Sequence, residues 1–286
     1  MATTTVSSPK SGTTTDALSC DSNIKRRNRV LLCGFQGVAP LGSPNPDVNP
    51  AGIALQIVSQ EDTDTGFTLL PQFYTQENKT PIVSTGARFS DPGVSYLELD
   101  VQDTRFQAGS WRSGAALDAR LNPQISERIA LPIPGRKLKN MGVSPFLRGF
   151  TIPSNTADSA LNIDIWASQI DDTGFTLNVK TWDRCAFSSV SVDWIAYSED
   201  KDEKTVRAAT LGQSPSGTKG WPGVSQTFAQ PLFQDVKTVF TAISYVNAQT
   251  DPALVGSVVA DRTKVALNPS NRASSRTRVE CIVITD

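Results

Sequence analysis

Trp182, Asp183 and Arg184 are consecutive residues at the end of a predicted strand, and they place an indole, a carboxylate and a guanidinium side by side. Lys180 and Thr181 come directly before them, so the segment is polar, and we expect Trp182 to be exposed. Such a Trp can contact a ligand, pack between two domains or stand alone on the surface. The sequence leaves these three interpretations open.

The residue types that most enzymes need are missing from this chain. It contains no histidine, which removes the commonest general base, the Ser-His-Asp and Cys-His nucleophile arrangements, and most zinc and copper sites. The four cysteines, Cys20, Cys33, Cys185 and Cys281, form no CxxC pair, although a disulfide between distant cysteines stays open. We therefore expect no enzymatic activity, no cofactor and no bound metal.

One pair of carboxylates has to be weighed separately. Asp171 and Asp172 are adjacent, but neighbouring residues of an extended chain point to opposite sides. A glycosidase needs two carboxyl groups that face each other across a cleft. We therefore assign the pair to a turn.

Length and charge bound the class of protein. A chain of 286 residues suits two or three domains, and a net charge of −1 argues against a nucleic-acid partner. The chain has no apolar run of about 18 residues, so no membrane insertion is expected. Residues 1–22 are rich in Thr, Ser, Gly and Pro and lack the apolar stretch of a signal peptide, which predicts a disordered tail. We expect a cytoplasmic protein, or one secreted without a leader.

Short strands have to position these residues. Phe175, Leu177 and Val179 alternate with polar residues, and so do Val190, Val192 and Trp194. This period of two is typical of antiparallel sheets with one solvated face. No long amphipathic helix is apparent, and Gly and Pro punctuate the runs, so we predict an all-β fold of antiparallel β-sandwiches.

The chain also contains internal repeats. Thr-Gly-Phe-Thr begins at Thr65 and again at Thr173, and the same spacing places Phe89–Ser90 at Tyr197–Ser198. The glycine allows a backbone angle that other residues resist, so the motif is interpreted as a folding device. A fainter third copy lacks this turn and ends in TRVECIVITD. We predict a divergent repeat at 23–100, the most complete repeat at 101–200, and a second divergent repeat at 201–286.

An ordered series of segments in the second repeat resembles the H-type lectins, the family of the snail agglutinin and of the C-terminal discoidin domain. The resemblance is good over 105–198, partial over 30–90 and weak in the third repeat. The matching segments are RFQAG (105–109), IALPIPG (129–135), SPFLRGFTI (144–152), LNIDIWASQ (161–169), the TGF turn, KTW (180–182) and VSVDWIA (190–196).

The resemblance implies a fold and a function. Family members are six-stranded antiparallel β-sandwiches that bind galactose-type sugars, especially N-acetylgalactosamine, without metal, and that assemble as trimers. It therefore implies a multivalent lectin whose partners are glycans. It is compatible with two arrangements, a homo-oligomer or three fused repeats closed into an intrachain pseudo-trimer, and the sequence leaves the choice open. The alternative is a structural or protein-interaction protein that has lost its sugar sites.

The resemblance also implies a set of binding residues. The family's sugar-stacking Trp falls on Trp182, and its usual His falls on Asp183. The family's Arg is replaced by Asn162, and Arg184 is close enough to supply the missing donor. Asp118 lies in the region of the family's first-loop Asp. In the first repeat Tyr74, Thr75 and Ile53 take the places of Trp182, Asp183 and Asn162, which implies a weaker site.

Overall fold

The protein is built from antiparallel β-strands. The computed structural model describes residues 12–13, 18–40, 53–60, 62–75, 89–153, 161–198, 205–213, 223–232, 234–248, 253–254, 258–267 and 276–285. Within these residues the one helical element is the 3-10 turn η1 (Arg26–Asn28), and every strand pairing is antiparallel. No helix in the described residues is long and apolar enough to cross a membrane. The prediction of an all-β fold is confirmed.

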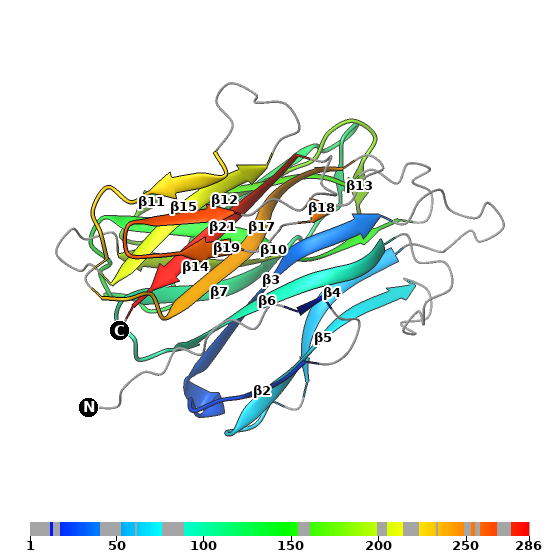
Figure 1. Ribbon diagram of the computed structural model, residues 1–286. Coiled ribbons are helices and arrows are strands. Elements are labelled where there is room, and N and C mark those ends of the chain that lie inside the picture. The colour runs from blue at the N-terminus through cyan, green and yellow to red at the C-terminus, as the bar shows by residue number, and fades with distance from the viewer. Residues whose placement is uncertain are drawn as a thin grey trace.

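The fold contains three large sheets, two with six strands each and a third with four (Figure 1). The four-stranded sheet has the order β1 (Gly12–Thr13), β6 (Phe89–Asp100), β3 (Arg29–Pro40) and β18 (Ala253–Leu254). One six-stranded sheet has the order β2 (Leu18–Asp21), β5 (Gly66–Thr75), β4 (Ile53–Gln60), β10 (Met141–Ile152), β14 (Ser189–Ser198) and β7 (Phe106–Arg112). The other has the order β15 (Val206–Gln213), β21 (Arg276–Ile284), β17 (Thr238–Ala248), β11 (Leu161–Asp171), β12 (Gly174–Lys180) and β9 (Gln124–Ala130).

Two small sheets complete the fold. The three-stranded one has the order β16 (Ser225–Thr227), β20 (Lys264–Leu267) and β19 (Val258–Ala260). The two-stranded one pairs β13 (Ala186–Phe187) with β8 (Leu117–Asp118).

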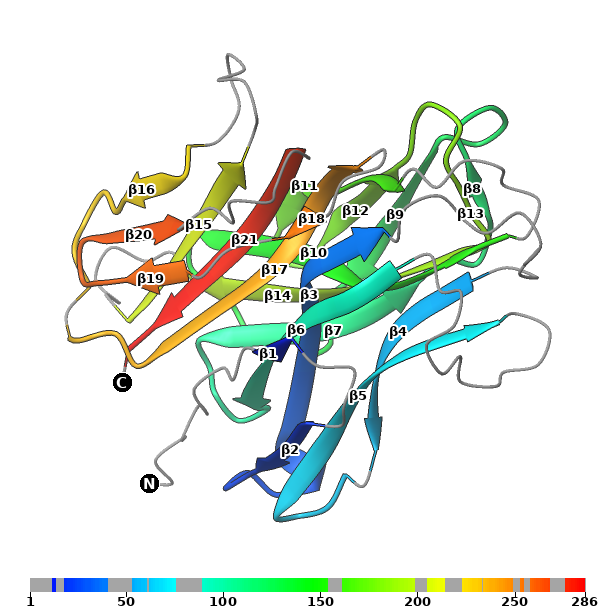
Figure 2. The ribbon, with the colours of Figure 1, turned by 45° about the vertical axis from the view of Figure 1, so that its right-hand side comes forward.

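The strand order has a regularity that runs through the whole chain. In one pattern the strand that comes last in sequence lies in the middle and the strand that comes first is its neighbour, as in β1-β6-β3, β7-β14-β10 and β15-β21-β17. In the other pattern the last strand of the set again lies in the middle, next to the strand directly before it in sequence, as in β2-β5-β4, β9-β12-β11 and β16-β20-β19. Three further pairings join segments that are distant in sequence: β10 with β4, β17 with β11, and β18 with β3. In both views the blue strand β3 also lies beside the orange strand β17 (Figures 1 and 2).

Part of the predicted tail is ordered. Within residues 1–22, β1 pairs with β6, and β2 pairs with β5, where Cys20 is opposite Phe67. Cys20 is buried in the core, and this burial explains why a Ser/Thr-rich segment ends in a strand. The prediction of disorder is wrong for 12–13 and 18–21, while residues 1–11 and 14–17 lie outside the described residues.

The glycines of the two TGF motifs are needed for close approach of the backbone. A Cβ on Gly174 would lie 2.0 Å from the carbonyl oxygen of Ile129, and one on Gly66 would lie 2.5 Å from that of Cys20. Neither glycine has a positive φ, so the expected reason, an unusual backbone angle, is wrong. The glycines let the neighbouring strands, β9 and β2, pack directly against the turn.

Three strands meet at a small contact in the centre of the molecule. A Cβ on Gly34 of β3 would lie 2.3 Å from the Cβ of Ala242 of β17 and 3.0 Å from Cδ2 of Phe146 of β10. The three residues occupy equivalent positions in the register: Gly34 is opposite Ser95, Ala242 is opposite Glu280, and Phe146 is opposite Asp193. The large side chain of Phe146 thus fills the space that is left by the small residues Gly34 and Ala242 on the two other strands.

Buried polar groups also connect the parts of the chain. The side chain of Asp193 is fully buried, and its carboxylate accepts hydrogen bonds from the backbone N–H of Cys33 (2.9 Å) and from Arg148 (3.2 Å). Burial raises the pKa of the Asp193 carboxyl, and Arg148 opposes that rise. All four cysteines are buried free thiols.

Candidate functional site

The segment that carries Trp182 is fixed by the end of β12. Thr181 is buried, its backbone N–H donates to the carbonyl of Pro123 (2.8 Å), and its hydroxyl donates to the carbonyl of Asn162 (2.8 Å). These bonds tie the segment to the chain just before β9 and to the start of β11. Trp182 therefore leaves the sheet from a rigid base rather than from a free loop.

Trp182 is half-buried, and its ring stacks on Tyr245 of β17, with centroids 5.2 Å apart and planes inclined by 26°. The guanidinium of Arg278, from β21, lies 5.7 Å from the centroid of the Tyr245 ring. Arg278 also forms an ion pair with Asp164 of β11, at 2.7 Å. Trp182 thus lies at the junction of β11 and β17, where segments distant in sequence are paired.

Asp183 and Asn162 contact each other directly. The Nδ2 of Asn162 donates to the Oδ2 of Asp183 (3.2 Å) and to the carbonyl oxygen of Trp182 (3.5 Å). Asn162 is fully buried, and its Oδ1 has no hydrogen-bond partner among the described residues. Asp183 is exposed and has a φ of 60°, a left-handed conformation that Asp tolerates better than most residues. The amide therefore orients a carboxylate that faces solvent.

The pairing of β8 with β13 brings the backbone of Asp118 close to the segment that contains Arg184. β8 and β13 pair Asp118 with Ala186, two residues after the exposed Arg184. The Oδ1 of Asp118 accepts the backbone N–H of Arg120 (2.8 Å), so the carboxylate orders its own turn. Burial raises the pKa of the Cys185 thiol, and the charges of Asp183 and Asp118 add to that rise, so both carboxylates lie near Cys185.

The structure therefore brings the second-repeat residues together. Asn162, Trp182 and Asp183 are joined by direct contacts, Arg184 continues the same segment, and Asp118 lies beside it on the paired β8. Tyr245, Arg278 and Asp164 were missed by the sequence reasoning. The signal that could have found them was Tyr245, an aromatic residue near the middle of the third repeat, but no residue of the other repeats was aligned with it.

The first-repeat counterparts lie on β4 and β5. Tyr74 is opposite Ala54, and Thr75 is opposite Ile53. Ala54 is also opposite Thr151 of β10, as Asn162 is opposite Asn247 of β17. Ala54 rather than Ile53 thus takes the place of Asn162, and the expected alignment was one residue out of register. The side chains of Tyr74 and Thr75 lie outside the described part of the structure.

The segment that carries this site also has a family match. Residues 147–197 match the family model of the H-type lectin domain. The H-type lectin segment runs from β10 to β14 and contains Asn162, Trp182, Asp183 and Arg184, but not Asp118. The match indicates carbohydrate binding in general. No curated protein and no solved structure matches the chain.

Metal binding is another chemistry to consider for the residues that the structure describes. No group of three or more His, Cys, Asp or Glu side chains in that part of the chain could hold a metal ion. What the site presents instead is a half-exposed aromatic surface, an oriented carboxylate and a nearby cation. Such groups recognise neutral polar molecules, because the indole contacts C–H surfaces while the charged groups exchange hydrogen bonds with hydroxyls.

Proposed function

We propose that the protein is a non-catalytic lectin that binds glycans at the segment Trp182–Arg184. The observation that carries this proposal is that the H-type lectin segment contains an indole, a carboxylate and a guanidinium at one solvent-facing turn, oriented by the buried Asn162. The exposed part of the Trp182 ring packs on the C–H face of a sugar. Asp183 accepts hydrogen bonds from hydroxyls, and Arg184 donates them.

The proposed ligands are galactose and N-acetylgalactosamine glycans. This choice rests on the resemblance to the H-type lectins, and two positions depart from the family pattern. Asp183 replaces a residue that is usually His, and Asn162 replaces an Arg. Both changes favour acceptors over donors. Arg184 supplies a donor from the same turn, and Asp118 borders the site on β8.

We also propose that the chain consists of three tandem lectin-like units, at 23–100, 101–200 and 201–286, closed into an intrachain pseudo-trimer. The strand order supports this arrangement, because each of the two three-stranded patterns occurs three times along the chain. The pairings β10–β4, β17–β11 and β18–β3 support closure, because each joins one set to another. Repeated units raise avidity by multivalency where more than one unit binds.

A second function is favoured by one specific observation. The stacking of Trp182 on Tyr245 joins β17 to the end of β12, and packing between units alone would account for an aromatic residue at this position. In that case the protein is a structural or protein-interaction protein that presents its sheet surfaces to a partner.

A glycan array distinguishes the two functions. Fluorescently labelled wild-type protein is applied at high density beside the variants Trp182→Ala and Val259→Ala, the latter at an exposed position on β19. The lectin proposal predicts that galactose-type glycans retain wild type and Val259→Ala but not Trp182→Ala. If no glycan retains the wild-type protein, the structural alternative holds.

A further inference from the structure

The outer face of β11 carries a second tryptophan, which the proposed sugar contact at Trp182 does not use. Along β11, Ile163 and Ile165 are fully buried in the core, so Asp164 and Trp166 lie on the opposite face of the sheet. Trp166 is only half-buried there. No hydrogen bond joins its indole N–H to a residue that the structure describes. A half-exposed indole with an unused donor is suited to contact a ligand.

The neighbours of Trp166 on this face are polar. Lys180 of β12 is opposite Asp164 and is exposed. Asn178 of β12 is opposite Trp166, and its Nδ2 donates to the Oγ of Ser168 (2.9 Å). Residues directly opposite each other in a sheet share one face, so these side chains surround the Trp166 ring. The face therefore combines an aromatic surface with hydrogen-bonding groups.

A row of contacts connects Trp166 with the stacked rings of Trp182 and Tyr245. Arg278 lies over the Tyr245 ring, 5.7 Å from its centroid. The Nη2 of the same guanidinium donates to the carbonyl oxygen of Ile165 (2.9 Å), the residue directly before Trp166. Both tryptophans also belong to the H-type lectin segment. The two indoles are therefore parts of one continuous surface and not of two separate ones.

The spacing of the two indoles suits a ligand longer than one sugar. Asn162 donates to the carbonyl oxygen of Trp182 and so marks that end of the surface. From Asn162 to Trp166 the strand β11 extends by about 13 Å, at about 3.3 Å per residue. Asp164 lies midway, with Lys180 opposite it, and both can exchange hydrogen bonds with hydroxyls. A single sugar ring cannot contact both indoles over this distance, whereas an oligosaccharide can.

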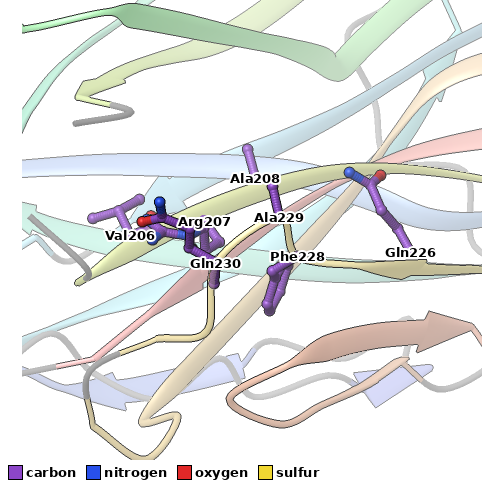
Figure 3. A pocket seen from close by; sticks show the side chains of 7 residues that line it. All are labelled: Val206, Arg207, Ala208, Gln226, Phe228, Ala229 and Gln230. Atoms are coloured by element: carbon purple, nitrogen blue, oxygen red, sulfur yellow. Dashed lines mark hydrogen bonds between the residues drawn. The ribbon is translucent and has the colours of Figure 1, made fainter. Parts of the chain in front are cut away.

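The same sheet also borders a hollow of about 480 Å³ at its edge strand β15 (Figure 3). Residues 206–208 form one wall, and Gln226 and residues 228–230 form the other. None of these residues belongs to the H-type lectin segment. The one aromatic ring among the described lining residues, Phe228, is buried, whereas Trp166 and Trp182 are both half-buried. Sugar stacking is therefore assigned to β11 and not to this hollow.

We infer that the Trp182 site extends along β11 as an oligosaccharide-binding surface, in which the Trp166 indole contacts an inner sugar. The inference rests on the proposed lectin function and names the class of glycan, a chain of several sugars whose terminal sugar is held at Trp182. An inner sugar packs its C–H face on Trp166. The sugars between the two indoles exchange hydrogen bonds with Asp164 and Lys180. Affinity should therefore rise with the length of the glycan.

The test is isothermal titration calorimetry of the full chain with galactose and with its β-linked oligomers galactobiose, galactotriose and galactotetraose. Wild-type affinity should rise at least about tenfold from galactose to galactotetraose. Trp166→Ala should bind galactose as wild type does but should lose this rise. Trp166→Tyr, which keeps an aromatic ring, should retain most of it. Val259→Ala, at an exposed position on β19, is the control and should behave as wild type.

The indole N–H signals give a second measurement, which a merely structural role of Trp166 would not change. In ¹⁵N-labelled protein, galactose should shift the signal of Trp182 alone. Galactotetraose should shift the signals of both Trp182 and Trp166, and Trp166→Phe assigns the latter.

Three results would overturn this inference and leave the lectin proposal intact. The first is a wild-type protein that binds galactose and galactotetraose with equal affinity. The second is a folded Trp166→Ala protein that keeps the full rise in affinity. The third is a Trp166 signal that does not move with saturating galactotetraose. A wild-type protein that binds no member of the series would overturn the lectin proposal, and this inference with it.

Discussion

The ring of Trp182 stacks on the ring of Tyr245 with their centroids 5.2 Å apart, and this contact joins the end of β12 to β17. Arg278 lies over the Tyr245 ring and pairs with Asp164, so the contact belongs to a network across the β11–β17 junction. The proposed sugar-binding indole is therefore held by a part of the chain about sixty residues further on. This dependence leads to the first prediction.

Replacing Tyr245 with Ala removes the stacking partner and frees the Trp182 ring to rotate. We expect the affinity for the bound glycan to fall about tenfold, which corresponds to about 1.4 kcal/mol, as measured by isothermal titration calorimetry. Tyr245→Phe is the matched control, because it keeps the ring and should keep the affinity. Unchanged affinity in a folded Tyr245→Ala protein would show that the stack does not orient the site.

The contact between Gly34 and Ala242 can be tested by a double-mutant cycle. Gly34→Ala puts a methyl group within 2.3 Å of the Ala242 Cβ, and such overpacking typically costs about 1–3 kcal/mol. Adding Ala242→Gly should recover part of that loss, which urea denaturation would measure. A coupling free energy near zero between the two substitutions would contradict the close packing of β3 on β17.

The buried Asp193 should contribute far more to stability than an exposed carboxylate. Asp193→Asn leaves Arg148 without its partner, and breaking a buried ion pair in this way costs about 3 kcal/mol. Asp172→Asn is the control, because Asp172 and Lys137 are mostly exposed and 3.8 Å apart, and it should change stability by less than about 0.5 kcal/mol. Equal losses in urea denaturation would contradict this interpretation.

Asp171 gives a pH-dependent prediction. Hydrogen bonds from Thr173 and Arg128 hold the pKa of this carboxyl well below its usual range. The unfolded chain therefore binds the proton first as the pH falls, and the stabilisation present above about pH 4 is lost at lower pH. Asp171→Asn should thus lower the Tm at pH 7, and the gap to wild type should close towards pH 2. A gap that is constant from pH 7 to pH 2 would exclude the ionised carboxylate as its cause.

The local features of the fold were predictable because they depend on neighbouring residues. Alternating apolar residues predicted the strands, and Trp194 is buried against Phe175, with ring centroids 5.0 Å apart, as expected of a core residue. The Asp171–Thr173 pattern predicted a turn, and the side chain of Asp171 accepts the backbone N–H of Thr173 (2.8 Å). These features need only the period of two and short-range hydrogen bonding.

The alignment between repeats failed where loop lengths differ. The spacing of the TGF motifs placed Phe89–Ser90 at Tyr197–Ser198, but the register places Val94 opposite Phe35 as Val192 is opposite Leu147. The connection from β5 to β6 is longer than that from β12 to β14, and surface connections tolerate such insertions. An alignment that assumes one constant spacing between repeats therefore fails after a connection whose length differs between them.

The junction residues could not be predicted for a related reason. Tyr245 and Arg278 reach the site only because β17 pairs with β11, and this pairing joins two parts of the chain that lack a shared motif. Asn162 shows the same difficulty, since its bond to Asp183 depends on the start of β11 lying beside the end of β12. Contacts of this kind follow from topology and not from local composition.

The central claim, that Trp182 contacts a sugar, can be tested directly by the indole N–H signals of the five tryptophans. Wild-type protein labelled with ¹⁵N is titrated with N-acetylgalactosamine and with galactose, and Trp182→Phe assigns the Trp182 signal. The lectin proposal predicts that the Trp182 signal shifts with added sugar while that of the buried Trp194 stays in place. A Trp182 signal that does not move at saturating sugar would contradict it.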